Sequence, residues 1–188
     1  MPPVQQVLIA NINSSNQVVL SGSLRRIKTL LTNLREFGGH DPRAVRLKAD
    51  SPFHSPLMKP AEEFMKTLLH KAGKDGKDLV TFPAAMPCVS NVTARPFTSM
   101  EELKDLLARQ AVETVLWWDS IKYLDKQEKV RRWIGMGPGK VGRNLVGKEV
   151  GMKGAVKGGG VWGINDPKEV EGIMRALDDT EKASEQDA

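Results

Sequence analysis

The residue best suited to chemistry is a histidine set between two prolines. His54 lies in the run Pro52-Phe53-His54-Ser55-Pro56, where the prolines restrict the backbone on both sides. A histidine on such a rigid turn suits general acid–base catalysis, because an ordinary histidine pKa near ~6.5 allows proton uptake and release at neutral pH. The alternative is a surface or helix-capping histidine without a chemical role.

A catalytic base needs a nucleophile, and the sequence offers no clear one. The G-x-S-x-G turn that exposes a hydrolase serine is absent from the 188 residues, and we do not expect Ser21, Ser55 or Ser90 on a strand-to-helix turn. Cys88 is the only thiol, and paired with His54 it would form a thiol site. Its apolar surroundings instead favour a buried packing residue in a strand.

Two phosphate-binding patterns occur in the glycine-rich segment after residue 136. Residues 137–142 (GPGKVG) match G-x-G-x-x-G, and residues 142–148 match G-x-x-x-x-G-K. For the first we expect no further β-α-β unit and no acidic residue at the end of a next strand, and the second has Glu149 where a magnesium-binding hydroxyl belongs. We interpret both as coincidences, which leaves Lys140 and backbone N–H groups at a helix start, able to meet an anion.

Composition favours a globular protein with a basic surface. Hydrophobic residues make up 40% of the chain, charged residues 27%, and the formal net charge is +5. Seven basic residues between positions 131 and 157 face only Glu149: Arg131, Arg132, Lys140, Arg143, Lys148, Lys153 and Lys157. Such a surface attracts nucleic acid, a CoA tail or an acidic carrier protein, and a solvated surface without a ligand is the alternative. The four tryptophans are too scattered for base stacking, so we expect no nucleic-acid partner.

Other classes are disfavoured by what the sequence lacks. One cysteine cannot form an internal disulfide and suits a reducing compartment. The single cysteine and three histidines have no close spacing, which predicts no structural zinc. No apolar run approaches the ~20 residues of a membrane span, and the N-terminal residues lack the pattern of a secretory signal.

The first part of the chain predicts a small α+β unit. Residues 4–10 and 17–21 are rich in β-branched residues and separated by turn-prone residues 11–16, which indicates two strands. Ser23 is a predicted cap for a helix that ends at Gly38 and Gly39. The alternating residues 43–48 (RAVRLK) predict a third strand.

The remainder predicts alternating helices and strands. After Pro56 we expect an amphipathic helix, then a strand over residues 86–92, and a helix that starts at a Thr98/Glu101 capping box and reaches Gln110. The next predicted helix has Trp117, Ile121 and Leu124 on its apolar face, with Trp117 in the core. A strand over 131–136, a helix near 141–149 and a loop over 151–160 follow. The last predicted helix runs from Asp166-Pro167 through Leu177 and precedes a frayed tail. This order favours the α/β class with a partly parallel sheet.

Several segments together resemble the malonyl-CoA:acyl-carrier-protein transacylases. Residues 11–22 resemble the family's N-x-N-S-x-x-Q-V-V-(I/L)-S-G segment, and residues 51–58 (SPFHSPLM) resemble its catalytic-histidine motif. Residues 89–96 (VSNVTARP) are similar to its S-N-x-T-A segment.

Two further motifs follow in family order. Arg109-Gln110 with Trp118 resembles R-Q-x(6)-V-x-W, and residues 137–141 resemble G-P-G-K-V. Residues 133–154 and the tail beyond resemble the fungal mitochondrial branch. That branch implies a mitochondrial matrix protein, although no transit peptide is visible in this sequence.

The resemblance implies the C-terminal part of an α/β-hydrolase-like acyltransferase domain with an inserted ferredoxin-like α+β subdomain. Residues 1–48 would form most of the small subdomain. Residues 49–150 would belong to the large subdomain, and residues 151–188 would be a C-terminal extension of loop, helix and frayed tail.

The resemblance also implies a two-step transfer of malonyl in fatty acid biosynthesis. A serine takes malonyl from malonyl-CoA and passes it to the phosphopantetheine thiol of acyl carrier protein, without a cofactor or metal. His54 would be the catalytic base and acid, oriented by the backbone carbonyl of Gln110. Phe53 would disfavour a methyl group on the substrate's α-carbon, unless it only packs, and Asn13 would support the site.

The chain departs from the family in what it lacks. Its residues do not include the G-H-S-x-G serine, the arginine that pairs with the malonyl carboxylate, or the glutamine-containing oxyanion loop. We therefore expect no malonyl transfer by this chain alone, and expect the apolar helix face of Trp117, Ile121 and Leu124 to be poorly covered. The alternative is a non-catalytic fragment that binds acyl carrier protein or CoA phosphates through Lys140, Arg143 and Lys148.

Overall fold

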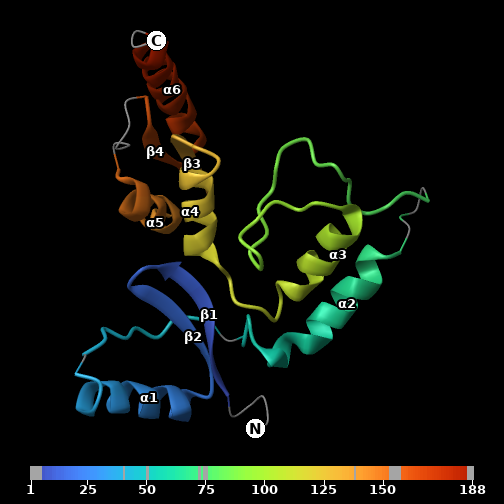
Figure 1. Ribbon diagram of the computed structural model, residues 1–188, viewed down its shortest axis with the longest axis vertical. Coiled ribbons are helices and arrows are strands. Elements are labelled where there is room, and N and C mark those ends of the chain that lie inside the picture. Colours follow the sequence, from blue (N-terminus) through green and yellow to red (C-terminus); the bar gives the residue numbers. More distant parts are fainter. Residues whose placement is uncertain are drawn as a thin grey trace. The chain divides into compact units, whose positions relative to one another are not determined.

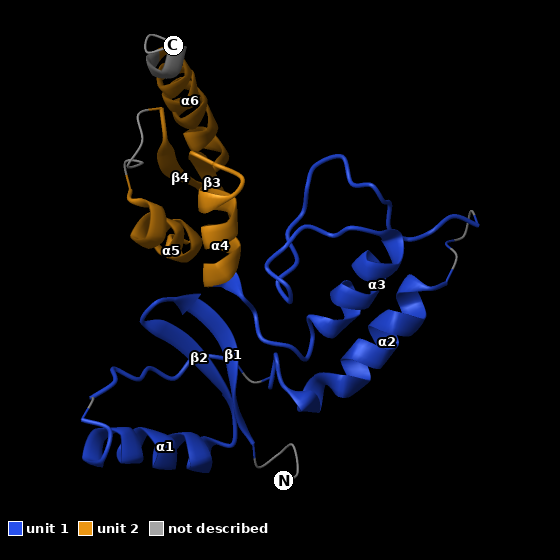
Figure 2. Ribbon diagram, in the orientation of Figure 1, with its two compact units in different colours: residues 1–117 blue, residues 118–188 orange. Residues whose placement is uncertain are grey.

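The computed structural model describes residues 6–39, 41–49, 51–71, 73, 76–137, 139–152 and 158–185 (Figure 1). The chain forms two compact units, residues 1–117 and 118–188 (Figure 2). The boundary at residue 117 differs from the predicted subdomain boundaries at residues 48 and 150. Those boundaries refer to the subdomains of a larger acyltransferase fold, and they stay predictions.

The first unit begins with an antiparallel hairpin. β1 (Val7–Ser14) pairs with β2 (Gln17–Gly22), from Val7 opposite Gly22 to Ser14 opposite Gln17. The two predicted strands are confirmed, but the turn is shorter than predicted, because Asn11 to Ser14 remain in the ladder with register shifts. Asn11 also bridges in parallel to Val115, so β1 has backbone partners on both edges.

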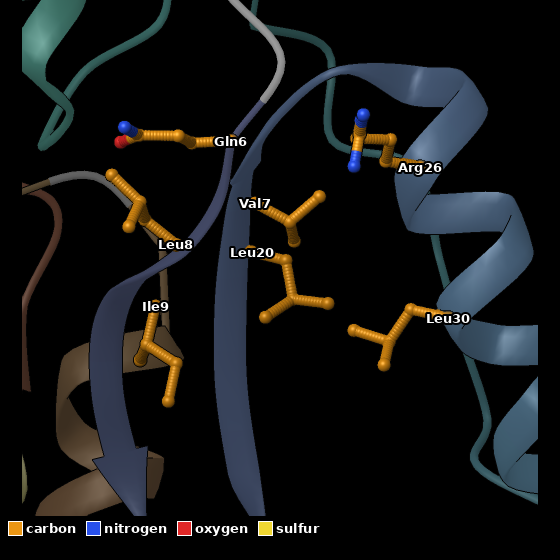
Figure 3. A pocket seen from close by; sticks show the side chains of 7 residues that line it. All are labelled: Gln6, Val7, Leu8, Ile9, Leu20, Arg26 and Leu30. Carbon is orange, nitrogen blue, oxygen red and sulfur yellow. The ribbon is translucent and has the colours of Figure 1, made fainter. Parts of the chain in front are cut away.

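α1 (Leu24–Glu36) lies beside the hairpin and has no buried side chain. The helix ends just before Gly38 and Gly39, the two glycines predicted to stop it. Ser23 is the N-cap residue as predicted, but its side chain makes no capping hydrogen bond. A hollow of about 520 Å³ separates α1 from the hairpin, and Leu20 and Leu30 extend into it (Figure 3). The other lining residues are Gln6, Val7, Leu8, Ile9 and Arg26, so no predicted site residue lines this hollow.

The predicted third strand over residues 43–48 is wrong. The segment is irregular, with Val45 70% and Leu47 58% exposed. Alternating apolar residues form a strand only where a sheet edge supplies hydrogen-bond partners and a surface to pack on. Among the described residues β1 and β2 form a two-stranded sheet, and this segment does not pair with it.

A helical pair carries the rest of the first unit. The short 3-10 helix η2 (Pro56–Met58) leads into α2 (Lys59–Leu69), which packs against α3 (Met100–Arg109). The cap of α3 lies one residue later than predicted. Ser99 Oγ accepts from the Glu102 amide at 3.1 Å, and the Glu102 carboxylate accepts from the Thr98 amide at 2.6 Å.

The predicted strand over residues 86–92 is also wrong. Only Val89 bridges, to Pro96, and a tight turn lies between them. Ser90 and Arg95 close this turn through a backbone hydrogen bond of 2.9 Å. Cys88 is exposed, contrary to the predicted packing role, because no strand buries it.

The second unit contains a parallel β-α-β arrangement. α4 (Trp117–Lys126) begins at the last residue of the first unit and precedes β3 (Arg132–Met136), α5 (Val141–Val150) and β4 (Gly160–Ile164). β3 and β4 are parallel, in register from Arg132 opposite Gly160, and α5 packs against both. The predicted helices and the strand near 131–136 are confirmed. β4 was not predicted, because its glycines resemble those of the preceding loop. Residues 153–157 of that predicted loop lie outside the described residues.

The interior of the second unit draws on four elements. Among its described residues the buried apolar side chains are Ile121 of α4, Val146 of α5, Val161 of β4 and Ile173 of α6 (Val170–Glu185). The expectation of an uncovered α4 face is therefore wrong at Ile121, which is 3% exposed. Trp117, predicted to lie in the core, is only half-buried.

The C-terminal helix starts where predicted and ends later. Asp166 caps the 3-10 helix η3 (Pro167–Glu169), accepting from the Lys168 amide at 2.9 Å, and α6 then continues past the predicted end at Leu177 to Glu185. None of the helices formed by the described residues is long and apolar enough to cross a bilayer.

Candidate active site

His54 sits on a tight turn in an unusual backbone conformation. Its φ is +58°, in the left-handed region that few residues other than glycine adopt, although histidine is enriched there. The Ser55 hydroxyl donates to the Pro52 carbonyl at 2.6 Å and closes the turn. Ser55 is 3% exposed, so the turn is anchored from inside while the His54 ring remains half-buried.

The His54 ring is held by main-chain oxygens. Nδ1 lies 2.9 Å from the Gln110 oxygen and 3.0 Å from the Glu113 oxygen. The His54 amide donates to the Ala111 oxygen at 3.1 Å. A carbonyl oxygen only accepts, so Nδ1 must carry the proton in these bonds. In the neutral ring Nε2 is then left unprotonated, which is the state a general base requires.

These oxygens belong to the turn that follows α3. Gln110 is the C-cap of the helix, and the amides of Val112 and Glu113 both donate to the Arg109 oxygen at 3.0 Å. The C-terminal end of a helix carries partial negative charge. The turn therefore points main-chain oxygens at the His54 ring.

β1 fixes the other end of this turn. The Val115 amide donates to the Ala10 oxygen at 2.8 Å, and the Ile12 amide donates to the Val115 oxygen at 2.9 Å. The Thr114 hydroxyl also donates to the Ile9 oxygen at 2.7 Å. The hairpin and the histidine turn thus share one backbone frame within the first unit.

This chain is similar to known proteins in both sequence and structure. A Bacillus subtilis malonyl CoA-acyl carrier protein transacylase is 34% identical over 171 residues, which are 91% of this chain and 49% of that protein. The Escherichia coli K12 protein of the same name is 33% identical over 73% of this chain and 41% of its own length. This chain is homologous to the malonyl CoA-acyl carrier protein transacylases. No family model matches it.

Solved transacylase structures share the fold. The Clostridium perfringens transacylase superposes with a TM-score of 0.76 and 26% identity, over 97% of this chain and 52% of that one. An S-malonyltransferase from Bartonella henselae gives 0.71 and 27%, over 91% and 49%. The fold is therefore that of the α/β acyltransferases, in part. The chain spans about half the length of the transacylases it matches, in agreement with the predicted C-terminal part.

Phe53 and Asn13, the other two predicted site residues of the transacylase motifs, lie differently. Phe53 is 52% exposed, with its ring centroid 6.5 Å from that of His54 and the planes tilted by 48°. The ring thus lies beside the histidine and is not packed into a core. Asn13 is half-buried on β1, and no hydrogen bond joins it to His54 within the described part of the chain.

A chain of ion pairs runs along α2 and α3 behind the histidine turn. Arg109 contacts Asp105 at 3.0 Å and Glu113 at 2.6 Å, and Lys66 contacts Asp105 at 3.6 Å and the buried Glu62 at 3.0 Å. The Arg109 hydrogen bond lowers the pKa of Asp105. Sequence reasoning singled out Arg109-Gln110 as a motif but missed Glu113 as the second acceptor, because a backbone oxygen leaves no signal in residue type.

The acidic residues in and after the glycine-rich segment make structural hydrogen bonds. Contrary to expectation, a parallel strand, β4, follows α5, and Asp166 comes soon after it. Asp166 caps η3, however, and Glu149 accepts from the Trp118 indole at 2.7 Å. Pro138, Lys153 and Lys157 of this segment lie outside the described residues.

The predicted anion-binding side chains differ in their surroundings. Lys140 and Lys148 are exposed. Arg143 is half-buried beside the parallel strands, with its Cδ 3.4 Å from the position of a Cβ at Gly163. No group of three or more histidine, cysteine or acidic side chains suited to a metal ion occurs among the described residues.

Proposed function

We propose that this chain supplies the catalytic histidine of a malonyl transacylase, which moves malonyl from malonyl-CoA to the phosphopantetheine thiol of acyl carrier protein without a cofactor. One observation carries the proposal: two carbonyl oxygens accept from His54 Nδ1 and leave Nε2 as a proton acceptor. The names of the homologous proteins supply the substrate and the carrier.

In this mechanism the nucleophilic serine comes from polypeptide outside the 188 residues. His54 Nε2 takes the serine proton as the serine oxygen attacks the thioester carbonyl of malonyl-CoA. The imidazolium then returns the proton to the leaving CoA thiolate. In the second half His54 accepts the proton of the carrier thiol and returns it to the serine. An oriented base of this kind contributes a factor of ~10²–10⁴ in rate.

Phe53 is the proposed specificity residue. Its exposed ring lies beside His54, where it would crowd a methyl group on the α-carbon of the acyl chain. One methyl group accounts for only ~1–3 kcal/mol of discrimination, so the proposed preference for malonyl is modest. Asn13 remains a proposed supporting residue on β1.

The central experiment is reconstitution. The part of the Bacillus subtilis transacylase that this chain does not match is produced together with this chain, and transfer of labelled malonyl to acyl carrier protein is measured. The pair should transfer malonyl, and His54→Asn should reduce the rate by ~10²–10⁴. A reconstituted pair whose rate is unchanged by His54→Asn would refute the proposed role.

The chain alone should transfer no malonyl above its own His54→Asn variant, because it lacks the serine. Transfer above that control would overturn this part of the proposal. Sequence upstream of Met1 provides an independent check, since an in-frame G-H-S-x-G would supply the nucleophile. Carrier binding at low salt by a chain that fails reconstitution would instead favour a non-catalytic binding fragment.

We further propose a mitochondrial matrix location, supported by the resemblance of residues 133–154 to the fungal mitochondrial branch. Fractionation of cells that express the complete gene with a C-terminal tag tests it. Tag recovered in the matrix fraction is the expected result, and tag confined to the cytosol would overturn it.

A further inference from the structure

We propose that Arg109 is a positioning residue for His54: its two ion pairs hold the turn from Gln110 to Glu113 that presents both oxygens to Nδ1. The consequence for catalysis rests on the proposed function. The claim about the state of the imidazole does not, so it can be tested on this chain alone.

The Arg109 guanidinium contacts residues on both sides of the end of α3. Arg109 Nη1 contacts Asp105 at 3.0 Å, one turn earlier on α3, and Nε contacts Glu113 at 2.6 Å, one turn later. These bonds join the regular helix to the turn beyond its end. A guanidinium offers several donors in a fixed plane, whereas a lysine ammonium is a compact point charge. Lysine at this position would keep the charge but lose the simultaneous pairing.

Glu113 is held twice by Arg109. Its carboxylate accepts from the Arg109 side chain, and its amide donates to the Arg109 oxygen at 3.0 Å. The Glu113 oxygen lies 3.0 Å from His54 Nδ1. A shift of Glu113 therefore moves one of the two acceptors of the ring proton.

The environment separates this pair from an ordinary surface ion pair. The side chains of Arg109 and Glu113 are each 38% exposed, whereas those of Arg175 and Glu171 on α6, with the same spacing, are 76% and 87% exposed. Exposed pairs of this kind usually contribute little. The α6 pair is thus a control with the same spacing, and no histidine among the described residues is hydrogen-bonded to it.

The experiment measures the tautomer of His54 by long-range ¹H–¹⁵N correlation on the full chain at high pH. Signals of the three histidines are assigned with the His54→Asn variant. In the unmodified chain the Nδ1–H form should dominate. In Arg109→Lys and Glu113→Met the ratio of Nδ1–H to Nε2–H should fall roughly threefold to tenfold, the factor expected for loss of one ordinary hydrogen bond.

The controls are Arg175→Lys and Glu171→Met, which should leave the ratio unchanged. Amide spectra of α3 confirm that each variant is folded, and the two variants remove the pair from opposite sides, so one misfolded protein does not decide the result. A ratio unchanged in a folded variant of either site would overturn the role of Arg109. Loss of the reconstituted activity is a separate readout and bears only on the proposed function.

Discussion

The His54 Nδ1 atom and the Gln110 main-chain oxygen lie 2.9 Å apart although 56 residues separate them in sequence. The contact joins the proline-bounded turn before α2 to the end of α3. A backbone oxygen cannot be protonated at neutral pH or removed by a side-chain substitution. The orientation of the ring thus depends on the path of the main chain after α3.

A substitution of the Gln110 side chain tests this point. Gln110→Ala keeps the oxygen, and alanine is a good helix former, so the Nδ1–H tautomer of His54 should remain dominant in the NMR measurement. Reconstituted malonyl transfer should fall far less than in His54→Asn. A loss of the Nδ1–H form in folded Gln110→Ala would show that the amide side chain orients the ring.

Phe53→Ser should relax the choice of acyl group. The ring is 52% exposed, so its removal should change the melting temperature little. The ratio of kcat/KM for malonyl-CoA to that for methylmalonyl-CoA, measured in the reconstituted pair, should fall by about tenfold, within the ~1–3 kcal/mol of one methyl group. Phe97→Ser is a control away from the histidine motif, and an unchanged ratio in Phe53→Ser would contradict the assigned contact.

Gly22→Ala should destabilise the hairpin. Gly22 has φ +137°, and a Cβ there would lie 2.1 Å from the Gln6 oxygen. Backbone strain of this kind costs about 1–3 kcal/mol, and the overlap with a main-chain oxygen adds to it. The control is Gly39→Ala, at φ +64° with nothing within 4 Å of the added atom. Urea denaturation of both variants should show the larger loss for Gly22→Ala, and equal losses would rule out the steric effect.

The sequence was sufficient where local pattern and tertiary structure agree. The 3.6-residue spacing located α1 and α2, the glycine-rich run before residue 141 located the start of α5, and β-branched residues located β1 and β2. It failed at residues 43–48 and 86–92, which have strand-like patterns but lie where no sheet edge receives them. It also failed at β4, where a Cβ at Gly160 would lie 2.3 Å from the Trp162 ring.

The candidate site was predictable only in its side chains. His54 was identified from its flanking prolines, and the family resemblance indicated the Gln110 oxygen. Glu113 was not identified, since its contact with the ring uses the backbone, and the role of Arg109 depends on distances that a motif does not contain.

Acid should destabilise the first unit through Glu62. This carboxylate is 3% exposed, and its pKa lies below the ordinary 4.5, chiefly because it accepts a hydrogen bond from Lys59. A lowered pKa in the folded state means that the stabilisation is present above the ordinary value and is lost as the pH falls through the folded one. At pH 7 Glu62→Gln should cost about 1.5–3 kcal/mol.

The cost should shrink as the pH falls below 4.5, because the unfolded chain then takes up a proton at Glu62 while the lowered pKa keeps the folded carboxylate charged. Urea denaturation at a series of pH values measures this. Glu63→Gln, at an exposed neighbouring position on α2, provides the control and should show a small effect. A Glu62→Gln cost that does not vary with pH would contradict the ionic origin of the stabilisation.

The turn after Val89 leaves room for only a small side chain at Ala94. Ala94 has φ +55° and is 1% exposed, and its amide donates to the Ser90 oxygen at 2.9 Å. A β-branched side chain is unfavourable in the left-handed region, and an overfilled interior costs about 1–3 kcal/mol. Ala94→Val should therefore lower the free energy of unfolding by roughly that amount or more, while Ala94→Gly, which accepts the same φ and fills no space, should change it much less.

Hydrogen exchange at Leu116 gives a second readout of this turn. The Leu116 amide donates to the Asn91 oxygen of the turn at 2.8 Å, so Ala94→Val should also speed hydrogen exchange at Leu116. Normal protection of Leu116 in Ala94→Val would mean that the turn absorbs the larger side chain without moving.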